Sequence, residues 1–354
     1  TPPFEQFIIP ADLPLAVQAF AIEAHADGFE YVSFGPAAAD SKAWKNIPLA
    51  LSMSDRVFMS GNLTTPDGKV SLPAARKCAE TIVRLSTVEE NGFANLRFCA
   101  LANVPAFTPF FPAAYAQPGR PSFALALEAA DLAVQAFGDA ASLQEAADSL
   151  VAAVEKHAKQ LEYVAGRLTQ MYGYEFKGLD FTLAPFPDDA VSIGRALEDL
   201  GLQAFGKPGS LFASAFLTST LDQARFKRTG FNGLMLPVLE DIRLAQSASE
   251  GNLSLRDLLM FSAVCGAGLD VIPLPGDTTA DELTPILLDL AALSLRLDKA
   301  LTARLMPIPG KKANEMTDFD FEFFANSCVL KVDSNPLHGK LAGEEEVKIT
   351  PRHI

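Results

Sequence analysis

One short phrase occurs twice in the C-terminal third of the chain and constrains the fold more than any other feature. Residues 269–277 read LDVIPLPGD and residues 301–311 read LTARLMPIPGK, so each is an apolar run that ends in Pro-x-Pro-Gly and a charge. Residues 280–297, between them, have apolar positions at helical spacing behind two acidic residues. A strand, a helix and a second strand form a parallel crossover unit. We therefore predict that both turns lie at the same edge of one sheet.

The two turns carry opposite charges, with Asp277 on the first and Lys311 on the second. Arg304 lies on the second strand, where alternation places it on one face with Met306 while Leu305 points to the other. A lone arginine in an apolar strand must reach a carboxylate, a carbonyl or a ligand. An ion pair with Asp270 or Asp277 and the binding of an anion both satisfy this need, and the sequence leaves both open.

Charged residues also follow other predicted strands. Residues 179–183 lead to Pro187 and Asp188, and residues 231–237 lead to Glu240. Parallel strands that send charged loops to one rim are typical of the ligand sites of α/β sheets and barrels. The alternative is that proline simply terminates these strands. The ligand-site reading predicts a polar site at the rim.

Residues 103–115 form an unusual segment with three prolines, three phenylalanines and Tyr115. Proline stiffens such a loop and the aromatic rings need burial, so we predict that it packs on the protein as a wall or lid. Two Ala-rich helices are predicted after it, over residues 122–137 and 142–171. Glu128 falls in the first and is costly to bury unless it is paired. We expect the pocket to be lined by Asn232, Tyr115, Glu128 and Asp270.

Composition excludes several classes of partner. The net charge of −14 argues against nucleic acid and anionic membranes, because phosphate binding needs clustered Lys and Arg. No stretch of about 18 residues is apolar enough to suggest a membrane span. The four cysteines are widely spaced and form no CxxC pair, which is typical of reduced thiols in the cytoplasm.

Few residues carry a recognisable catalytic motif. Cys265 stands at a predicted helix-to-strand turn, where it is either a buried thiol or a nucleophile that needs a neighbouring base. The histidines neighbour no motif, so neither a Ser-His-Asp machine nor a zinc site is supported. Gly266-Ala-Gly268 is no dinucleotide fingerprint. Carboxylates that meet at the rim would suit Mg²⁺ or Ca²⁺, with Asp277 and Glu240 as ligands.

The phrases at residues 103–115, 231–241, 264–277 and 307–311 together resemble the uncharacterised family known as domain of unknown function 711. The resemblance extends over roughly residues 27–324. It implies an α/β barrel similar to the ten-stranded barrel of the glycyl radical enzymes, and we expect a single barrel domain over residues 1–333. The polar and charged composition of residues 334–354 predicts a C-terminal tail. The resemblance implies no established reaction, and barrels of this size suggest a homodimer.

The chain departs from the radical enzymes where their chemistry begins. The C-terminal part holds no Arg-Val-x-Gly-Tyr phrase, and Gly339 and Gly343 stand among charged residues. A thiyl mechanism at Cys265 would therefore have no radical glycine to initiate it. The barrel would still supply a central cavity lined by loop ends.

The sequence thus favours a cytoplasmic, non-radical enzyme that acts on a small anionic metabolite, a carboxylate or a phosphate. Arg304 and Lys311 would hold the anion, Asp277 and Glu240 would act as general base or as ligands of a divalent cation, and Cys265 would complete the catalytic set. One alternative is a catalytically silent protein that binds or senses the metabolite. Another is a structural role, in which the charged rim forms an oligomer interface.

Overall fold

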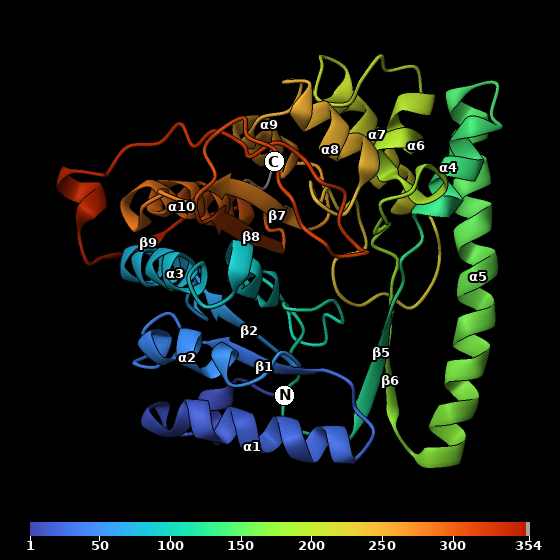
Figure 1. Cartoon of the computed structure of the whole chain (residues 1–354). Helices are drawn as coiled ribbons and strands as arrows, with labels where there is room; N and C mark the ends of the chain where they lie inside the picture. Colours follow the sequence, from blue (N-terminus) through green and yellow to red (C-terminus); the bar gives the residue numbers. More distant parts are fainter. Residues whose placement is uncertain (352–354) are drawn as a thin grey trace.

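The computed structural model describes residues 1–351 and has a mixed α/β architecture (Figure 1). The long helix α5 begins where a side chain caps it: the Ser142 hydroxyl accepts a hydrogen bond from the Glu145 amide at 3.2 Å, and Gly173 in the left-handed conformation ends it. The helices are α1 (Leu13–Ala26), α2 (Ile47–Ser52), α3 (Leu72–Leu85), α4 (Ala130–Gly138), α5 (Leu143–Tyr172), α6 (Ile193–Asp199), α7 (Ser210–Leu221), α8 (Ile242–Ser249), α9 (Leu255–Phe261) and α10 (Ala280–Leu297).

The main sheet has the strand order β1-β2-β4-β8-β7, in which only the β4–β8 pair is antiparallel. Two smaller sheets pair β5 with β6 in parallel and β3 with β9 in antiparallel orientation. The strands are β1 (Val32–Ala37), β2 (Val57–Asn62), β3 (Lys69–Ser71), β4 (Phe98–Ala102), β5 (Ser122–Ala126), β6 (Glu175–Asp180), β7 (Gly268–Pro275), β8 (Leu301–Ile308) and β9 (Glu346–Lys348).

The predicted crossover unit is confirmed. β7 and β8 pair in parallel and α10 connects them. The Gly276 amide donates to the Lys311 carbonyl at 3.0 Å, so the two Pro-x-Pro-Gly turns lie side by side at one edge. α10 opens with a capping box between Thr279 and Glu282, which agrees with the predicted start.

One face of the main sheet carries the core and the other carries a cavity. α3 and α10 pack against each other and against β8, beside α2 and α1 (Figure 1). Leu301, Ala303 and Leu305 of β8 belong to the large core cluster on this side. The predicted alternation along β8 is confirmed, because Arg304 faces the opposite side. β5, β6 and α5 lie across that second side.

Two local predictions are wrong. Residues 122–137, predicted as one helix, form β5 and α4 instead, since the alternating Phe-Ala-Leu-Ala run pairs with β6. Residues 231–237, predicted as a strand, make a single bridge from Pro237 to Asp270. Asn232 has φ +48° there, which interrupts an extended strand.

The α/β class is confirmed, whereas the closed ten-stranded barrel is not: over residues 1–351 the strands form the three separate sheets given above. In the predicted tail, β9 pairs with β3, and residues 352–354 lie outside the described residues. The division at residue 333 stays a prediction. None of the helices within residues 1–351 is long and apolar enough to cross a membrane.

Candidate functional site

A cavity of about 630 Å³ lies against the face of β4, β7 and β8 that is turned away from α10, and we call it the central cavity. Its polar side is formed by Glu128, Glu240, Asp270, Thr302 and Arg304, and its walls are largely aromatic. The predicted loop over residues 103–115 supplies part of the wall through Phe110 and Phe111. The prediction that this loop packs on the protein is therefore confirmed, and the loop forms part of the cavity wall.

Arg304 is the centre of the polar side. Its side chain is 10% exposed, its Nε donates to Asp270, and its Nη2 donates to both Glu240 oxygens at 3.1 and 3.3 Å. Within residues 1–351 no protein group accepts a hydrogen bond from Nη1. Burial by itself would lower the pKa of Arg304, but the two carboxylates outweigh it and raise that pKa. Arg304 is thus a permanent cation with one nitrogen free for a ligand.

A β-bulge aims Asp270 at Arg304. Asp270 and Val271 of β7 stand together opposite Arg304 alone, and the flanking pairs are Leu269 with Ala303 and Ile272 with Leu305. Val271 has φ +37°, a conformation that β-branched residues rarely adopt. Such strain costs about 1–3 kcal/mol and persists only where the surroundings hold it. The bulge in β7 therefore sets the direction of the Asp270 carboxylate.

Glu240 is placed by a turn beside β7. The Val238 amide donates to the Asp270 carbonyl at 3.2 Å, and the Glu240 amide donates back to the Pro237 carbonyl at 3.1 Å. Burial raises the pKa of Glu240 to about 7, although the charge of Arg304 acts in the opposite direction. Partial burial also raises the pKa of Glu128, which follows β5. The cavity thus holds two carboxyl groups that favour their neutral form more than ordinary carboxyls do.

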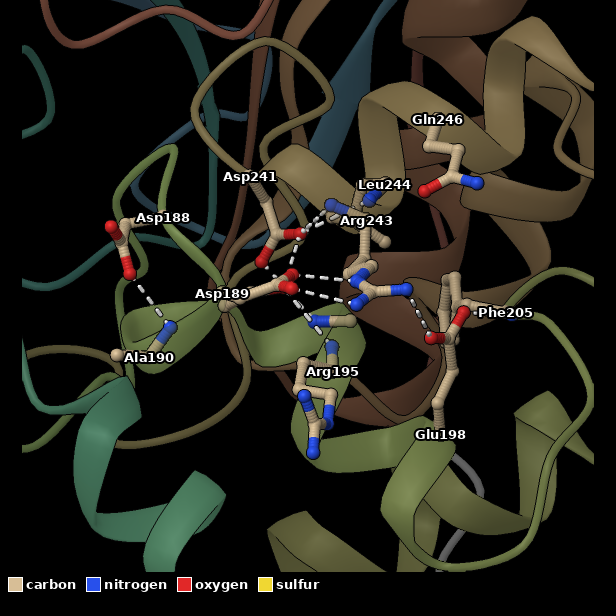
Figure 2. A network of polar contacts seen from close by, with 12 residues as sticks. Asp188, Asp189, Ala190, Arg195, Glu198, Phe205, Asp241, Arg243, Leu244 and Gln246 are labelled. Atoms are coloured by element: carbon tan, nitrogen blue, oxygen red, sulfur yellow. Dashed lines mark hydrogen bonds and ion pairs between the residues drawn. The ribbon is translucent and has the colours of Figure 1, made fainter.

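The next residue, Asp241, has a carboxylate that accepts several hydrogen bonds (Figure 2). Its buried carboxylate accepts hydrogen bonds from the Arg243 and Leu244 amides, which open α8. It also accepts from the hydroxyl of Ser192 at 2.8 Å and from the Ile193 amide at 2.6 Å, which open α6. One carboxylate therefore joins the first turns of two helices directly behind Glu240.

Replacing Asp241 with alanine should lower the free energy of unfolding by about 2 kcal/mol, because several buried donors lose their acceptor. Urea unfolding of the purified variant measures this. Asp188→Ala is the matched control. Within residues 1–351 the Asp188 side chain accepts a hydrogen bond only from the Ala190 amide, at an exposed turn, and its loss should cost about 0.5 kcal/mol. Equal losses in the two variants would show that Asp241 does not hold α6 and α8 together.

Four predicted site residues meet in the central cavity and five do not. Glu128, Glu240, Asp270 and Arg304 meet there. The others lie elsewhere, although Asp277 and Lys311 do share the predicted sheet edge. They lie beyond the strand ends, whereas the cavity is on the face of the strands. The predicted pairings of Lys311 with Arg304, and of Asp277 with Glu240 as metal ligands, are therefore not formed.

Each of these five residues has its own surroundings. Asp277 borders a hollow of about 280 Å³ with Thr278, Glu282, Lys312 and Lys331, and Lys311 pairs with Asp318 at 3.1 Å. Cys265 is buried, and its Sγ accepts from the Gly268 amide at 3.3 Å. The Asn232 side chain accepts from the Phe181 amide and donates to the Thr229 carbonyl. Tyr115 donates to the Val104 carbonyl at 2.8 Å and lines a different cavity.

Sequence reasoning missed three kinds of cavity residue. Thr302 could have been found, since it precedes Arg304 by two positions and so shares its face of β8. Cys99 lines the cavity from β4, and burial raises the pKa of its thiol well above the ordinary value, so it is neutral at pH 7. Phe321 and Phe323 come from the segment after β8 and had no signal beyond their apolar character.

Within residues 1–351, no three His, Cys, Asp or Glu side chains are arranged to hold a metal ion. The predicted ligands Asp277 and Glu240 border different cavities. A carboxylate site for Mg²⁺ or Ca²⁺ on these two residues would need a different arrangement of the chain.

A family model described as Uncharacterised ACR (DUF711) matches residues 15–326 of the chain. The chain belongs to this DUF711 family. The family predicted from the sequence is therefore confirmed, and the similarity of its fold to the glycyl radical enzymes stays a prediction.

Curated relatives of the chain come from several organisms. A UPF0210 protein of Syntrophobacter fumaroxidans is 31% identical over 304 residues, which cover 82% of this chain and 66% of the relative. A second, of Pyrobaculum aerophilum, is 32% identical over 300 residues, which cover 80% and 64%. A third, of Neisseria gonorrhoeae, is 28% identical over 296 residues, which cover 81% and 66%. The chain thus spans about two thirds of the length of these relatives.

Proposed function

We propose that this DUF711 protein is an acid–base enzyme that binds a small monocarboxylate in the central cavity and moves a proton next to a carbonyl group. The observation that supports this most is Glu240, a carboxyl with a pKa of about 7 in contact with a buried arginine. A general acid or base works best when its pKa is close to the working pH. A guanidinium beside it suits a negatively charged oxygen.

The charges of the cavity favour one negative charge on the ligand over two. Arg304 is the positively charged residue in the lining of the central cavity. The same lining holds three carboxyl groups, those of Glu128, Glu240 and Asp270. A phosphate dianion would meet net repulsion there. A monocarboxylate can bind Nη1 of Arg304 while Glu240 is protonated and donates its own hydrogen bond. The anionic metabolite that the sequence favours is in this way narrowed to a carboxylate.

Of two carboxyl groups in different surroundings, one can act as general acid and the other as general base. With a 2-oxo monocarboxylate, protonated Glu240 would donate to the oxo oxygen while Glu128 takes a proton from the neighbouring carbon. The C–H bond breaks, its electron pair forms the enol double bond, and the return of a proton reverses the step. Glu240 therefore serves as the acid in this scheme, whereas the sequence alone favoured a base.

Monocarboxylate binding should depend on pH with a definite sign. Because the pKa of Glu240 in the free protein is about 7, affinity should be flat well below pH 7 and fall about tenfold per pH unit above it. Titration calorimetry with a 2-oxo monocarboxylate of about four carbons measures this. Glu240→Gln, which cannot lose a proton, should bind with no such slope.

Glu198→Gln is the matched control, since Glu198 also has a raised pKa because of burial but lies outside the cavity. It should keep the wild-type slope. If affinity instead rises with pH, the site prefers a cationic ligand and the proposal is wrong. If no monocarboxylate binds at any pH, the silent or interface alternatives gain support.

We also propose that the sheets are arcs of an incomplete α/β barrel around the central cavity. Supporting this, Leu179 of β6 bridges to Arg228 and Pro237 bridges to Asp270 of β7, both in parallel. These bridges continue the β5–β6 pair toward the main sheet. Similarity to the barrel of the glycyl radical enzymes, a cytoplasmic location, a homodimer and the absence of nucleic acid or membrane partners stay proposals as well.

A further inference from the structure

A second and larger cavity of about 1010 Å³, here the outer cleft, opens between β1, an edge strand of the main sheet, and β5, a strand of the two-stranded β5–β6 sheet. β1 contributes Val32 on one side and β5 contributes Phe123 on the other. Helix α1 and the loop over residues 103–115 close its remaining sides, mostly with apolar residues. The proposed reaction does not use this cleft.

The outer cleft and the central cavity share part of their lining. Tyr31, Pro109 and Phe111 border both spaces. Phe111 stacks on Phe58 with ring centroids 5.1 Å apart, and Tyr31 packs edge-on against the same ring at 5.6 Å. Phe111 and Tyr31 are 40% and 47% exposed. The two spaces are therefore neighbours, and the partly exposed Phe111 and Tyr31 side chains stand where they meet.

We propose that the outer cleft holds the apolar tail of the substrate whose carboxylate binds Arg304, so that the substrate is an amphipathic monocarboxylate. This inference rests on the proposed function and names its substrate class. The ligand enters through the cleft, its tail stays between α1 and β5, and its head reaches the central cavity past Phe111.

The charges of the outer cleft agree with a tail and not with a second head group. Among the described residues, Lys177 is the one Lys or Arg whose side chain lines the outer cleft. Its Nζ already pairs with Glu175 at 2.8 Å and lies 4.3 Å from the centre of the Phe107 ring. Glu23 of α1 and Asp27, which follows that helix, are the acidic groups of the lining and would repel a carboxylate. We therefore expect an anionic ligand to bind with its charge at Arg304 and its carbon chain in the outer cleft.

The test is the affinity of saturated monocarboxylates from about four to about ten carbons, measured by titration calorimetry below pH 7. Each methylene group that enters an apolar site should improve affinity about fourfold. Ala19→Trp fills the cleft from an exposed position on α1, so long acids should lose this gain while short acids bind unchanged. Ala152→Trp, exposed on α5 and away from both cavities, is the control and should behave as the wild type.

Each outcome decides the proposal. A gain with chain length that Ala19→Trp removes and Ala152→Trp preserves supports it. If short acids bind and length adds nothing, or if Ala19→Trp keeps the gain, the tail does not lie in the cleft and this inference is wrong while the proposed function stands. If no acid binds, both fail together.

Discussion

Replacing Arg304 with alanine is expected to lower the free energy of unfolding by about 3–5 kcal/mol. The substitution leaves the Asp270 carboxylate, 4% exposed, without the partner that its charge requires. It also removes the hydrogen bonds to Glu240. Urea unfolding followed by circular dichroism measures the change.

Arg195→Ala is the matched control, because Arg195 pairs with Asp199 within one helix and is 41% exposed. Its loss should cost at most about 0.5 kcal/mol. The double variant Arg304→Met/Asp270→Leu should recover most of the stability, since it removes both charges of the most buried pair, and burial favours the neutral form of the remaining Glu240 carboxyl. A cost for Arg304→Ala as small as that of the control would mean that the Asp270 carboxylate does not depend on the charge of Arg304, and this explanation of the polar side of the cavity would be wrong.

Glu240→Gln is expected to slow proton exchange on a bound 2-oxo monocarboxylate by about 10²–10⁴-fold. The glutamine keeps the shape of the side chain but cannot give a proton to the oxo oxygen. Proton NMR in D₂O measures the exchange as loss of the signal from the carbon next to the carbonyl. Wild-type exchange should decline above pH 7, as the carboxyl ionises.

Glu198→Gln should exchange at the wild-type rate, since that carboxyl lies on α6, outside the cavity. Binding of the same acid to Glu240→Gln, measured in parallel below pH 7, separates loss of chemistry from loss of affinity. Equal exchange in the two variants would remove Glu240 from the reaction. Binding by the wild type with no exchange above the rate in buffer would indicate a silent sensor.

Much of the fold around the site could be predicted because its signals are local. The β7–α10–β8 unit combines two apolar runs, a capped amphipathic helix and two strong terminators, and each signal supports the others. β5 was missed because Phe-Ala-Leu-Ala fits both a helix and a strand, and only its partner β6 decides between them. That partner lies more than 50 residues away in the sequence.

The site was predictable where burial made a charge conspicuous. Arg304 and Asp270 stand in apolar strands, so each demanded a partner, and the structure pairs them. Sequence spacing reveals that Asp277 and Lys311 share a sheet edge. The central cavity lies on the sheet face instead, and that placement depends on how β5, β6 and the aromatic loop close over it.

The bulge in β7 has a consequence for how the strand can vary. Leu269, Ile272 and Leu274 all belong to the large core cluster, although uninterrupted alternation would send Leu269 to the side opposite the other two. The bulge at Asp270 and Val271 adds one residue to the strand. Beyond it, even-numbered side chains face the side of the sheet that odd-numbered side chains face before it. No single substitution can undo this, whereas deletion of one residue would turn Ile272 and Leu274 toward the cavity. The number of residues in β7 therefore determines both the direction of the Asp270 carboxylate and the direction of the core side chains. A point substitution at Asp270 leaves the core side chains facing the core, and a point substitution in the core leaves Asp270 facing the cavity.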